Sequence, residues 1–334
     1  MRCGDALEGS ATASMLRAHE HRLGTRVRLP CRWPSVSYRW LSVEFVSIPA
    51  IEVSEPVIGS LSPSRAADFK TCPLLYRLRS IDRLPEEPSP AAVRGSLVHG
   101  VLERLFDVPA SERTVSAAEA LVGAQWLALT EAEPELAEMF ADPTELAAWL
   151  ESARPLLAAY FELEDPTRIE PAEREQLVEV VLPSGLRLRG FVDRLDVAPS
   201  GEVRVVDYKT GASPREAFEG KALFQLKFYA LVIWRTRGVV PRQLRLLYLG
   251  DRDMLTYAPE ELELARFERT LEALWAAIAR ATEARDFRPS PSRLCDWCTF
   301  KSLCPAFGGT PPPYPVTPRL LASPVEDVSP VADD

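Results

Sequence analysis

The stretch from residue 176 to residue 209 narrows the possible folds sharply, because its hydrophobic residues alternate with polar ones instead of recurring at a helical period. Three such runs, QLVEVVLP, LRLRGFVDRLDVAP and EVRVVDYKT, are separated by the tripeptide PSG at 183–185 and again at 199–201. Proline, serine and glycine favour tight turns, so consecutive strands should pair antiparallel. The sequence therefore predicts a three-stranded antiparallel meander.

Helical patterns lie on both sides of this meander. Residues 61–78 begin with Ser62 as an N-cap and Pro63 at the first helical position, and residues 93–106 carry a helical stripe of leucines and valines. A further strand is expected at 242–250. Further helices are expected at 116–130, 143–163, 221–237 and 259–285. This order predicts a mixed α/β (α+β) fold, in which a mixed β-sheet containing the meander is flanked by helices.

The two ends of the chain lack such patterns. Residues 1–53 show weak periodicity and remain unassigned, residues 54–307 are expected to form one domain, and residues 308–334, rich in proline and acid, are expected to be a disordered tail. No apolar run approaches the roughly 20 residues of a membrane span, and the N-terminus lacks the apolar core of a signal peptide. We therefore expect a cytoplasmic protein with no membrane partner.

The charge distribution bears on a nucleic-acid partner. The net charge of −9 argues mildly against one, but net charge averages over the whole surface. Arginines gather around residues 77–94 and again around 285–293, whereas acidic residues concentrate in 131–138 and 161–176. A basic groove on an acidic body is compatible with this pattern.

Asp207 and Lys209 lie at the end of the third strand, in the segment VVDYKTG. In an extended chain both project from one face, with Tyr208 on the other. The ordinary interpretation of such a pair is a solvated ion pair of little energetic value. The chain has only five lysines among its 39 basic residues, however, and it keeps a compact, tunable amine at this position.

Asp193, in GFVDRLD, lies on the neighbouring strand, and the turn at 199–201 would bring its carboxylate towards Asp207. Two carboxylates in a small volume repel each other unless a cation lies between them, and a hard divalent ion such as Mg²⁺ meets this need. Lys209 beside that ion could orient or deprotonate a water and stabilise charge on a phosphate. Asp196 points to the opposite face, so we expect it to pair with an arginine.

His99 is the only histidine outside the unassigned N-terminal residues, and it lies beside the apolar stripe of its predicted helix. Glu103 follows one turn later on the same face. A lone helical histidine is more often a hydrogen-bonded packing residue than a ligand. The residues alone therefore leave the role of His99 open.

Four short motifs, GSLVHGVLE, GFVDRLD, VVDYKTG and QLKFYA, occur in this order. Together they resemble the RecB-type exonuclease branch of the PD-(D/E)XK nuclease superfamily over residues 61–307. Members of this branch have Gly-x-x-x-His on a helix, Gly-x-x-Asp on a strand, then Asp-x-Lys, then Gln-x-x-x-Tyr on a helix. The matching positions here are Gly95 and His99, Gly190 and Asp193, Asp207 and Lys209, and Gln225 and Tyr229. Each motif is weak alone, but the ordered set is specific.

The resemblance implies a restriction-endonuclease-like core and hydrolysis of DNA phosphodiester bonds with Mg²⁺ or Mn²⁺. The implied metal ligands are His99, Asp193, Asp207 and the backbone carbonyl of Tyr208. Lys209 would assist the attacking water. Gln225 and Tyr229 would support the site or contact the DNA backbone, and the alternative for these two is a helix face packed against the sheet.

Three cysteines cluster near the end of the expected domain, and Cys72 lies far upstream in TCPLLYRL. The three are Cys295, Cys298 and Cys304. Three thiolates need a fourth ligand to complete a tetrahedral site. AddB-type subunits and CRISPR-adaptation nucleases carry one N-terminal and three C-terminal cysteines around a 4Fe–4S cluster, which the resemblance implies for these four residues. Structural zinc and unligated cysteines are the alternatives.

The leading interpretation is a nuclease that acts on DNA ends or single strands in DNA repair or recombination. The sequence contains no Gly-x-x-x-x-Gly-Lys-Ser/Thr stretch, so any unwinding is expected to come from a separate helicase. A second hypothesis is a DNA-binding scaffold, or a subunit of a helicase–nuclease complex, whose nuclease site is unused. A third is a redox-responsive regulator in which the cluster acts as the sensor.

Overall fold

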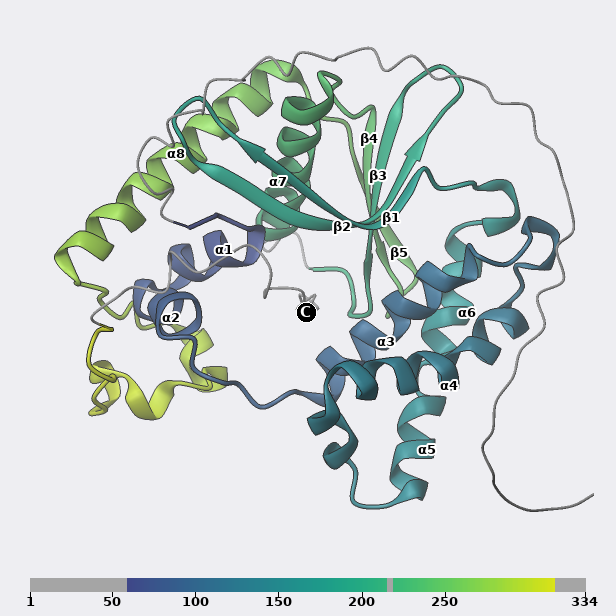
Figure 1. The fold of residues 1–334 in the computed structure, drawn as a ribbon, viewed down its shortest axis with the longest axis horizontal. Helices are drawn as coiled ribbons and strands as arrows, with labels where there is room; N and C mark the ends of the chain where they lie inside the picture. Colours follow the sequence, from purple (N-terminus) through teal and green to yellow (C-terminus); the bar gives the residue numbers. More distant parts are fainter. Residues whose placement is uncertain (1–58, 215–218, 316–334) are drawn as a thin grey trace, which may run out of the picture. The chain divides into compact units, whose positions relative to one another are not determined.

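The computed structural model, drawn in Figure 1, describes residues 59–214 and 219–315. Residues 1–53, which the sequence left unassigned, lie outside these ranges, as do residues 316–334 of the expected tail. In the described part of the chain, no helix is both long enough and apolar enough to cross a membrane.

A five-stranded sheet forms the centre of the fold, in the order β1-β2-β3-β4-β5. Its strands are β1 (Glu173–Val181), β2 (Arg187–Val197), β3 (Val203–Lys209), β4 (Gln243–Tyr248) and β5 (Asp253–Tyr257). Neighbours pair antiparallel except β3 and β4, which are parallel. The predicted meander is β1–β3, and its two PSG turns place Gly185 and Gly201 at φ 81° and 85°, where a side chain would be strained.

The helices surround this sheet. They are α1 (Pro63–Thr71), α2 (Pro73–Tyr76), α3 (Pro90–Leu105), α4 (Val115–Ala132), α5 (Pro143–Glu151), α6 (Arg154–Leu163), α7 (Glu219–Arg237) and α8 (Glu261–Ala284). The prediction of a single helix at 143–163 is wrong, because α5 and α6 are separate helices. Pro155, in the first turn of α6, supplies no amide hydrogen that could continue α5. Strand β5, a short and mostly exposed edge strand, was not predicted from the sequence.

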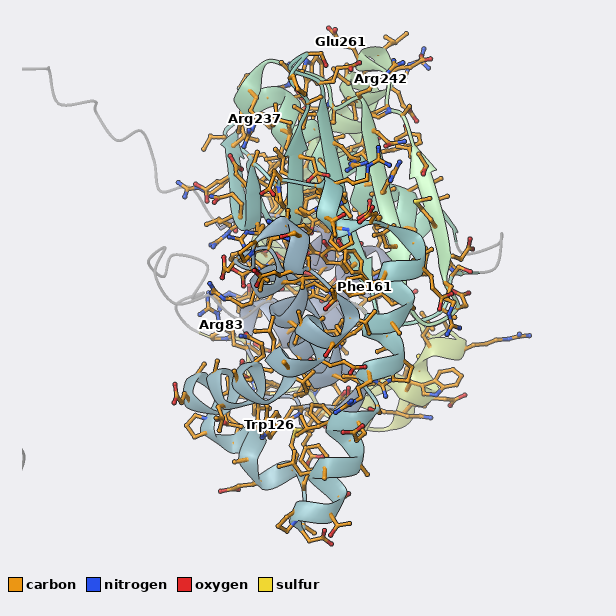
Figure 2. All side chains as sticks on the ribbon, turned by 90° about the vertical axis from the view of Figure 1, so that its right-hand side faces the viewer. Arg83, Trp126, Phe161, Arg237, Arg242 and Glu261 are labelled. Carbon is orange, nitrogen blue, oxygen red and sulfur yellow. The ribbon has the colours of Figure 1, made fainter. Side chains whose placement is uncertain are left out.

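Each face of the sheet packs against its own group of helices (Figure 1). Val203 and Val205 of β3 belong to a core shared with α7 and α8. Val206 and Tyr208 belong to a second core shared with α3, α4 and α6. In the side-on view of Figure 2, Trp126 of this second group lies towards one end of the molecule, and Arg237 and Arg242 lie towards the other. The structure confirms the expected fold class, a mixed sheet flanked by helices.

The C-terminal segment packs back on the body of the domain beyond residue 307, the predicted end of the domain. Arg77 donates a hydrogen bond to the carbonyl of Pro312. The ring of Tyr314 stacks on Phe287, with the ring centroids 6.1 Å apart. Packed structure therefore extends at least to Tyr314.

Candidate active site

The carboxyl end of β3 presents an acid and an amine on the face of the sheet that α7 covers. Asp207 is buried, and its Oδ2 lies 3.0 Å from Nζ of Lys209. This is the same-face arrangement that strand alternation predicts for residues two apart. The Oδ2 atom of Asp207 is buried and accepts no hydrogen bond of good geometry, so this carboxylate retains capacity to bind a cation.

Asp193 of β2 reaches the same end of the sheet. Its Oδ2 accepts a hydrogen bond of 2.6 Å from the backbone amide of Tyr208, so the side chain is fixed against β3. The strand register pairs Arg194 with Val206, which places Asp193 opposite Asp207 just beyond the last paired residues. The structure thus brings the two predicted carboxylates to neighbouring positions. The Asp193 carboxylate also adds to the burial that raises the pKa of Asp207, as expected for two neighbouring acids.

His99 of α3 contacts this end of the sheet from the other helical layer. Its Nε2 lies 2.9 Å from the backbone carbonyl oxygen of Tyr208, and its Nδ1 lies 3.5 Å from Oδ2 of Asp193. Glu103, which the sequence placed on the same helical face, instead lies with its carboxylate 3.5 Å from the guanidinium of its neighbour Arg104. Both ring nitrogens of His99 therefore face polar atoms of the candidate site.

Glu175 of β1 completes the group, and the sequence analysis missed it. Its Oε1 lies 3.7 Å from Nδ1 of His99. One ligand atom each from His99, Glu175 and Asp193 lie within 4.8 Å of one another, which is close enough for a shared ion. Glu175 also has φ 43°, which is uncommon for a residue with a side chain and costs conformational energy. Backbone strain of this kind concentrates at functional sites, but it leaves no signal in the sequence.

Helix α7 supports Asp207 through two predicted residues. Gln225 Nε2 donates to Oδ1 of Asp207 over 3.3 Å and lies 3.5 Å from the hydroxyl of Tyr229. The ring of Tyr229 is buried against β2, where a Cβ at Gly190 would meet its Cε1 at 2.8 Å. The absence of a side chain at Gly190 therefore lets Tyr229 approach the strand. Gln225 therefore contacts the carboxylate of Asp207, and Tyr229 packs against β2 at Gly190.

The acidic residue expected to be structural has that role. Asp196 accepts a hydrogen bond from Arg194 Nε over 3.1 Å and pairs with Arg204 at 2.7 Å, on the side of the sheet away from Asp207. This confirms the prediction that Asp196 pairs with arginine.

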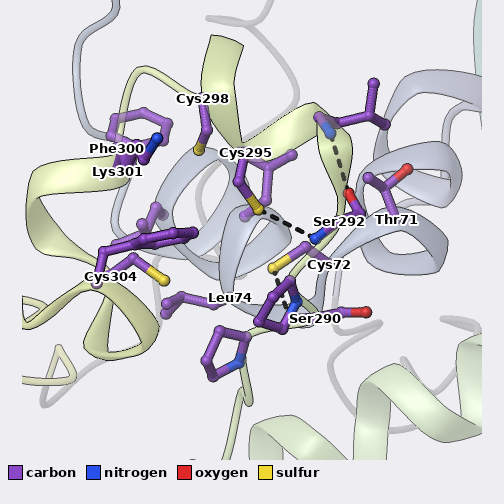
Figure 3. Close-up of a pocket in the computed structure, with 16 residues that line it drawn as sticks. Thr71, Cys72, Leu74, Ser290, Ser292, Cys295, Cys298, Phe300, Lys301 and Cys304 are labelled. Carbon is purple, nitrogen blue, oxygen red and sulfur yellow. Dashed lines mark hydrogen bonds between the residues drawn. The ribbon is translucent and has the colours of Figure 1, made fainter.

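Figure 3 shows the four clustered cysteines at the junction of α1 and α2 with the C-terminal segment. Cys72, Cys295, Cys298 and Cys304 line one pocket together with apolar residues such as Leu74 and Phe300. All four are free of disulfides. The backbone amide of Ser290 donates to Sγ of Cys72 over 3.4 Å, and that of Ser292 donates to Sγ of Cys295 over 3.3 Å. The distant Cys72 therefore lies with the other three, as expected.

The model of the PD-(D/E)XK nuclease superfamily matches residues 60–305, well over half of the chain. The chain belongs to the PD-(D/E)XK nuclease superfamily. It is accordingly a nuclease, a hydrolase that acts on nucleic acid, and the predicted restriction-endonuclease-like fold is confirmed. The match spans the elements that carry His99, Asp193 and Lys209.

Two phage proteins and one crystal structure are similar to this PD-(D/E)XK chain. The Gene 69 protein of Mycobacterium phage L5 is 36% identical over 127 residues, which is 37% of this chain and 41% of that protein. The Gene 69 protein of Mycobacterium phage D29 is 26% identical over 269 residues, covering 74% of this chain and 96% of that protein. A "Putative exonuclease" from Eubacterium rectale has the same fold, with a TM-score of 0.51, 15% identity, and coverage of 86% of this chain and 100% of that one.

The electrostatics of the site fit the divalent metals that PD-(D/E)XK nucleases use. Burial, reinforced by Asp193, raises the pKa of Asp207 to about 7 against the opposing effect of Lys209. Burial also raises the pKa of Asp193. For His99, burial lowers the pKa, but the carboxylates of Asp193 and Glu175 outweigh it and raise the pKa to about 9. A bound cation reduces the repulsion between clustered carboxylates and so allows them to be ionised together. The donor set therefore suits Mg²⁺ or Mn²⁺.

Proposed function

We propose that this chain is a RecB-type, divalent-metal-dependent deoxyribonuclease that degrades DNA from ends or as single strands in repair or recombination. The observation that carries the proposal is the convergence of His99, Glu175 and Asp193 beside the Asp207–Lys209 pair at the end of β3. The similarity in fold to the "Putative exonuclease" of Eubacterium rectale agrees with exonuclease action.

The residues that would hold Mg²⁺ or Mn²⁺ are the expected set with one addition. They are His99, Asp193, Asp207, the carbonyl of Tyr208 and Glu175. His99 Nε2 and the Tyr208 oxygen lie 2.9 Å apart, so both could contribute to holding one bound ion. When bound, such an ion would stabilise charge on the phosphate and make a nearby water more acidic.

Lys209 would contribute the positive charge of its side-chain ammonium group. Its Nζ is held by Asp207, so it can donate hydrogen bonds to the attacking water or to a phosphate oxygen without a large rearrangement. Gln225 would hold Oδ1 of Asp207 and so keep Oδ2 turned towards Lys209. Phosphodiester hydrolysis gains most from such positioning and charge stabilisation, because charge spreads over the phosphate oxygens in the transition state.

The test compares Lys209→Met and Asp207→Asn with Lys227→Met. Lys227 is a suitable control because it pairs with Glu263 on α8, at 2.7 Å, and takes no part in the candidate site. With Mn²⁺ and end-labelled linear DNA, we expect the two site variants to lose about a hundredfold or more of their cleavage rate and the control to keep it. Undiminished cleavage by both site variants would refute the assignment. A wild-type protein that shifts DNA on a gel without shortening it would indicate a scaffold.

We also propose that the four cysteines hold a 4Fe–4S cluster, which would join α1 and α2 to the C-terminal segment. A single zinc ion would draw its ligand sulfurs to about 3.8 Å from one another, given Zn–S bonds of about 2.3 Å. Among the described residues, no three cysteine sulfurs lie within 4.8 Å of one another. A cluster needs a wider arrangement, because each sulfur binds a different iron. The amide hydrogen bonds to Cys72 and Cys295 would stabilise thiolate ligands.

The cluster is tested by anaerobic purification followed by absorption spectroscopy and metal analysis. We expect a brown protein with a broad band near roughly 400 nm and iron bound in preference to zinc. Cys72→Ser should lose the band, whereas the Lys209→Met nuclease variant should keep it. A colourless protein that contains zinc would overturn the iron assignment.

A cytoplasmic location, where thiols stay reduced, and a separate helicase that supplies single-stranded ends complete the proposal.

A further inference from the structure

Arg194 of β2 is a completely buried arginine that the proposed chemistry does not use. Its guanidinium donates to the hydroxyls of Tyr208 at 2.8 Å and Tyr160 at 3.3 Å. It also donates to carboxylate oxygens of Glu164 at 2.7 Å and Asp196 at 3.1 Å. Nearly every donor of this side chain therefore has a partner on the side of the sheet opposite Asp207.

A buried ionic network of this kind is weak evidence for stability, because well-packed apolar side chains often serve as well. The network here is nevertheless extensive. Glu164, which directly follows α6, also accepts from Arg245 of β4 at 3.2 Å, and Asp196 also pairs with Arg204 of β3. The group thus links β2, β3, β4 and α6 directly behind the candidate site. This location points to a function in shaping the site.

Tyr208 connects Arg194 to the proposed metal ligands. The Tyr208 side chain lies on the Arg194 face of β3, whereas its backbone lies between the candidate ligands. Its amide donates to Asp193 at 2.6 Å, and its carbonyl oxygen lies 2.9 Å from His99 Nε2. The Tyr208 ring also meets the His99 ring edge-on, with the centroids 5.8 Å apart. A displacement of Tyr208 as a whole would therefore move the carbonyl that contacts His99, the amide that binds Asp193 and the ring that meets His99 together.

We propose that Arg194 is a positioning residue that acts through Tyr208: by fixing the phenol, it fixes the backbone carbonyl and amide between His99 and Asp193 in the geometry that binds a divalent ion. The inference rests on the proposed metal site. Without the hydrogen bond from Arg194 to the Tyr208 hydroxyl, the ligands would have to become ordered when the ion binds. The free energy spent on that ordering would lower the affinity for the ion. Changes to groups that orient metal ligands typically weaken metal binding by roughly 10- to 100-fold.

Two variants test the inference. Arg194→Met removes the guanidinium but leaves Glu164 with Arg245 and Asp196 with Arg204, so no acid loses every charged partner. Tyr208→Phe removes only the hydroxyl that Arg194 contacts, and it keeps the test decisive if Arg194→Met does not fold. The matched control is Arg113→Met. Arg113 is another buried arginine, whose guanidinium donates to backbone carbonyls such as that of Ile169 at 2.6 Å and to Glu170, not to Tyr208.

Mn²⁺ binding is measured by calorimetry at a temperature at which every variant is folded, and thermal unfolding is measured in parallel. We expect about tenfold or weaker Mn²⁺ affinity for Arg194→Met and a smaller loss for Tyr208→Phe. Arg113→Met should unfold at a lower temperature with unchanged Mn²⁺ affinity. Cleavage by Arg194→Met should recover as Mn²⁺ is raised to saturation.

Wild-type Mn²⁺ affinity in both Arg194→Met and Tyr208→Phe would overturn the positioning role while leaving the nuclease proposal intact. Equal weakening by Arg113→Met would also overturn it, because general loosening of the domain would then account for the effect. A wild-type protein that neither binds Mn²⁺ nor cleaves DNA would overturn the proposed function and this inference together.

Discussion

Replacement of Gly190 by alanine should destabilise the domain and also impair the candidate site. An added Cβ would lie 2.8 Å from Cε1 of Tyr229 and 3.6 Å from Cδ of Pro63. Carbon atoms in good contact are about 3.5–4.0 Å apart, so the Tyr229 contact is too short by roughly 0.7 Å or more. The methyl group has little room to move, because Pro63 of α1 lies beside it and Tyr229 is buried.

The size of the effect follows from two opposing contributions. Overpacking of a buried site typically costs about 1–3 kcal/mol. Alanine in place of glycine recovers about 0.5–1 kcal/mol by restricting the unfolded chain. We therefore expect Gly190→Ala to lower the free energy of unfolding by about 1 kcal/mol, within a range of about 0–2.5 kcal/mol. The displaced Tyr229 ring would also disturb Gln225, which contacts both the Tyr229 hydroxyl and Asp207, so cleavage should slow as well.

Urea unfolding of the wild type, Gly190→Ala and Gly123→Ala measures this effect. Gly123 lies in α4 with no atom within 4 Å of an added Cβ, so its replacement should raise the free energy of unfolding by about 0.5–1 kcal/mol. Adding Tyr229→Leu to Gly190→Ala should recover part of the lost stability, because the clashing ring is then absent. If Gly190→Ala behaves like Gly123→Ala, the close approach of Tyr229 to β2 is not the reason for glycine at this position.

Four further predictions concern the metal site and the helix that carries His99. Glu175→Gln should weaken Mn²⁺ binding by roughly tenfold in calorimetry, since one anionic oxygen near His99 is lost; unchanged binding would exclude Glu175 from the site. Mn²⁺ affinity should rise with pH from about 6.5 to about 9, because the ion must displace the proton that His99 holds more tightly than a free imidazole does. A flat profile would contradict a protonated His99 in the metal-free protein. In the metal-free protein, the stabilisation from charged His99 should be complete below pH 6.5 and lost as the pH rises through about 9. Ser89→Ala removes the hydrogen bond from the Ala92 amide that caps α3, so it should lower the free energy of unfolding by about 1 kcal/mol. At a temperature where both proteins are folded, its Mn²⁺ affinity should equal that of the wild type.

The sequence predicted the central strands and the position of Asp207 well, because both depend on local rules. Alternation with a period of two fixes which side chains share a face, and two glycine turns fix the order of β1–β3. The break between α5 and α6 was a missed local signal, because Pro155 was present in the sequence to mark it. Strand β5 carried a weaker signal, since an exposed edge strand need not show a hydrophobic face.

Glu175 could not be selected from the sequence for a different reason. It lies in a segment with several other glutamates, and only the pairing of β1 with β2 places it opposite Asp193. Its position beside His99 further depends on a backbone conformation at φ 43° that ordinary strand geometry would not predict. The partners of Cys72 are also non-local, and spacing alone could not have brought Cys72 to the C-terminal cysteines. Only resemblance to a family supplied that expectation.

The two-sided character of β3 explains why a tyrosine stands between Asp207 and Lys209. The side chains of Asp207 and Lys209 face the layer of α7, whereas the Tyr208 side chain enters the opposite core and contacts Arg194. The Tyr208 backbone, at the boundary between these two layers, contacts His99 and Asp193. A shift of one residue in β3 would exchange the two faces, removing the acid and the amine from the site and the phenol from its buried network. The site and the buried network therefore require the same register of β3.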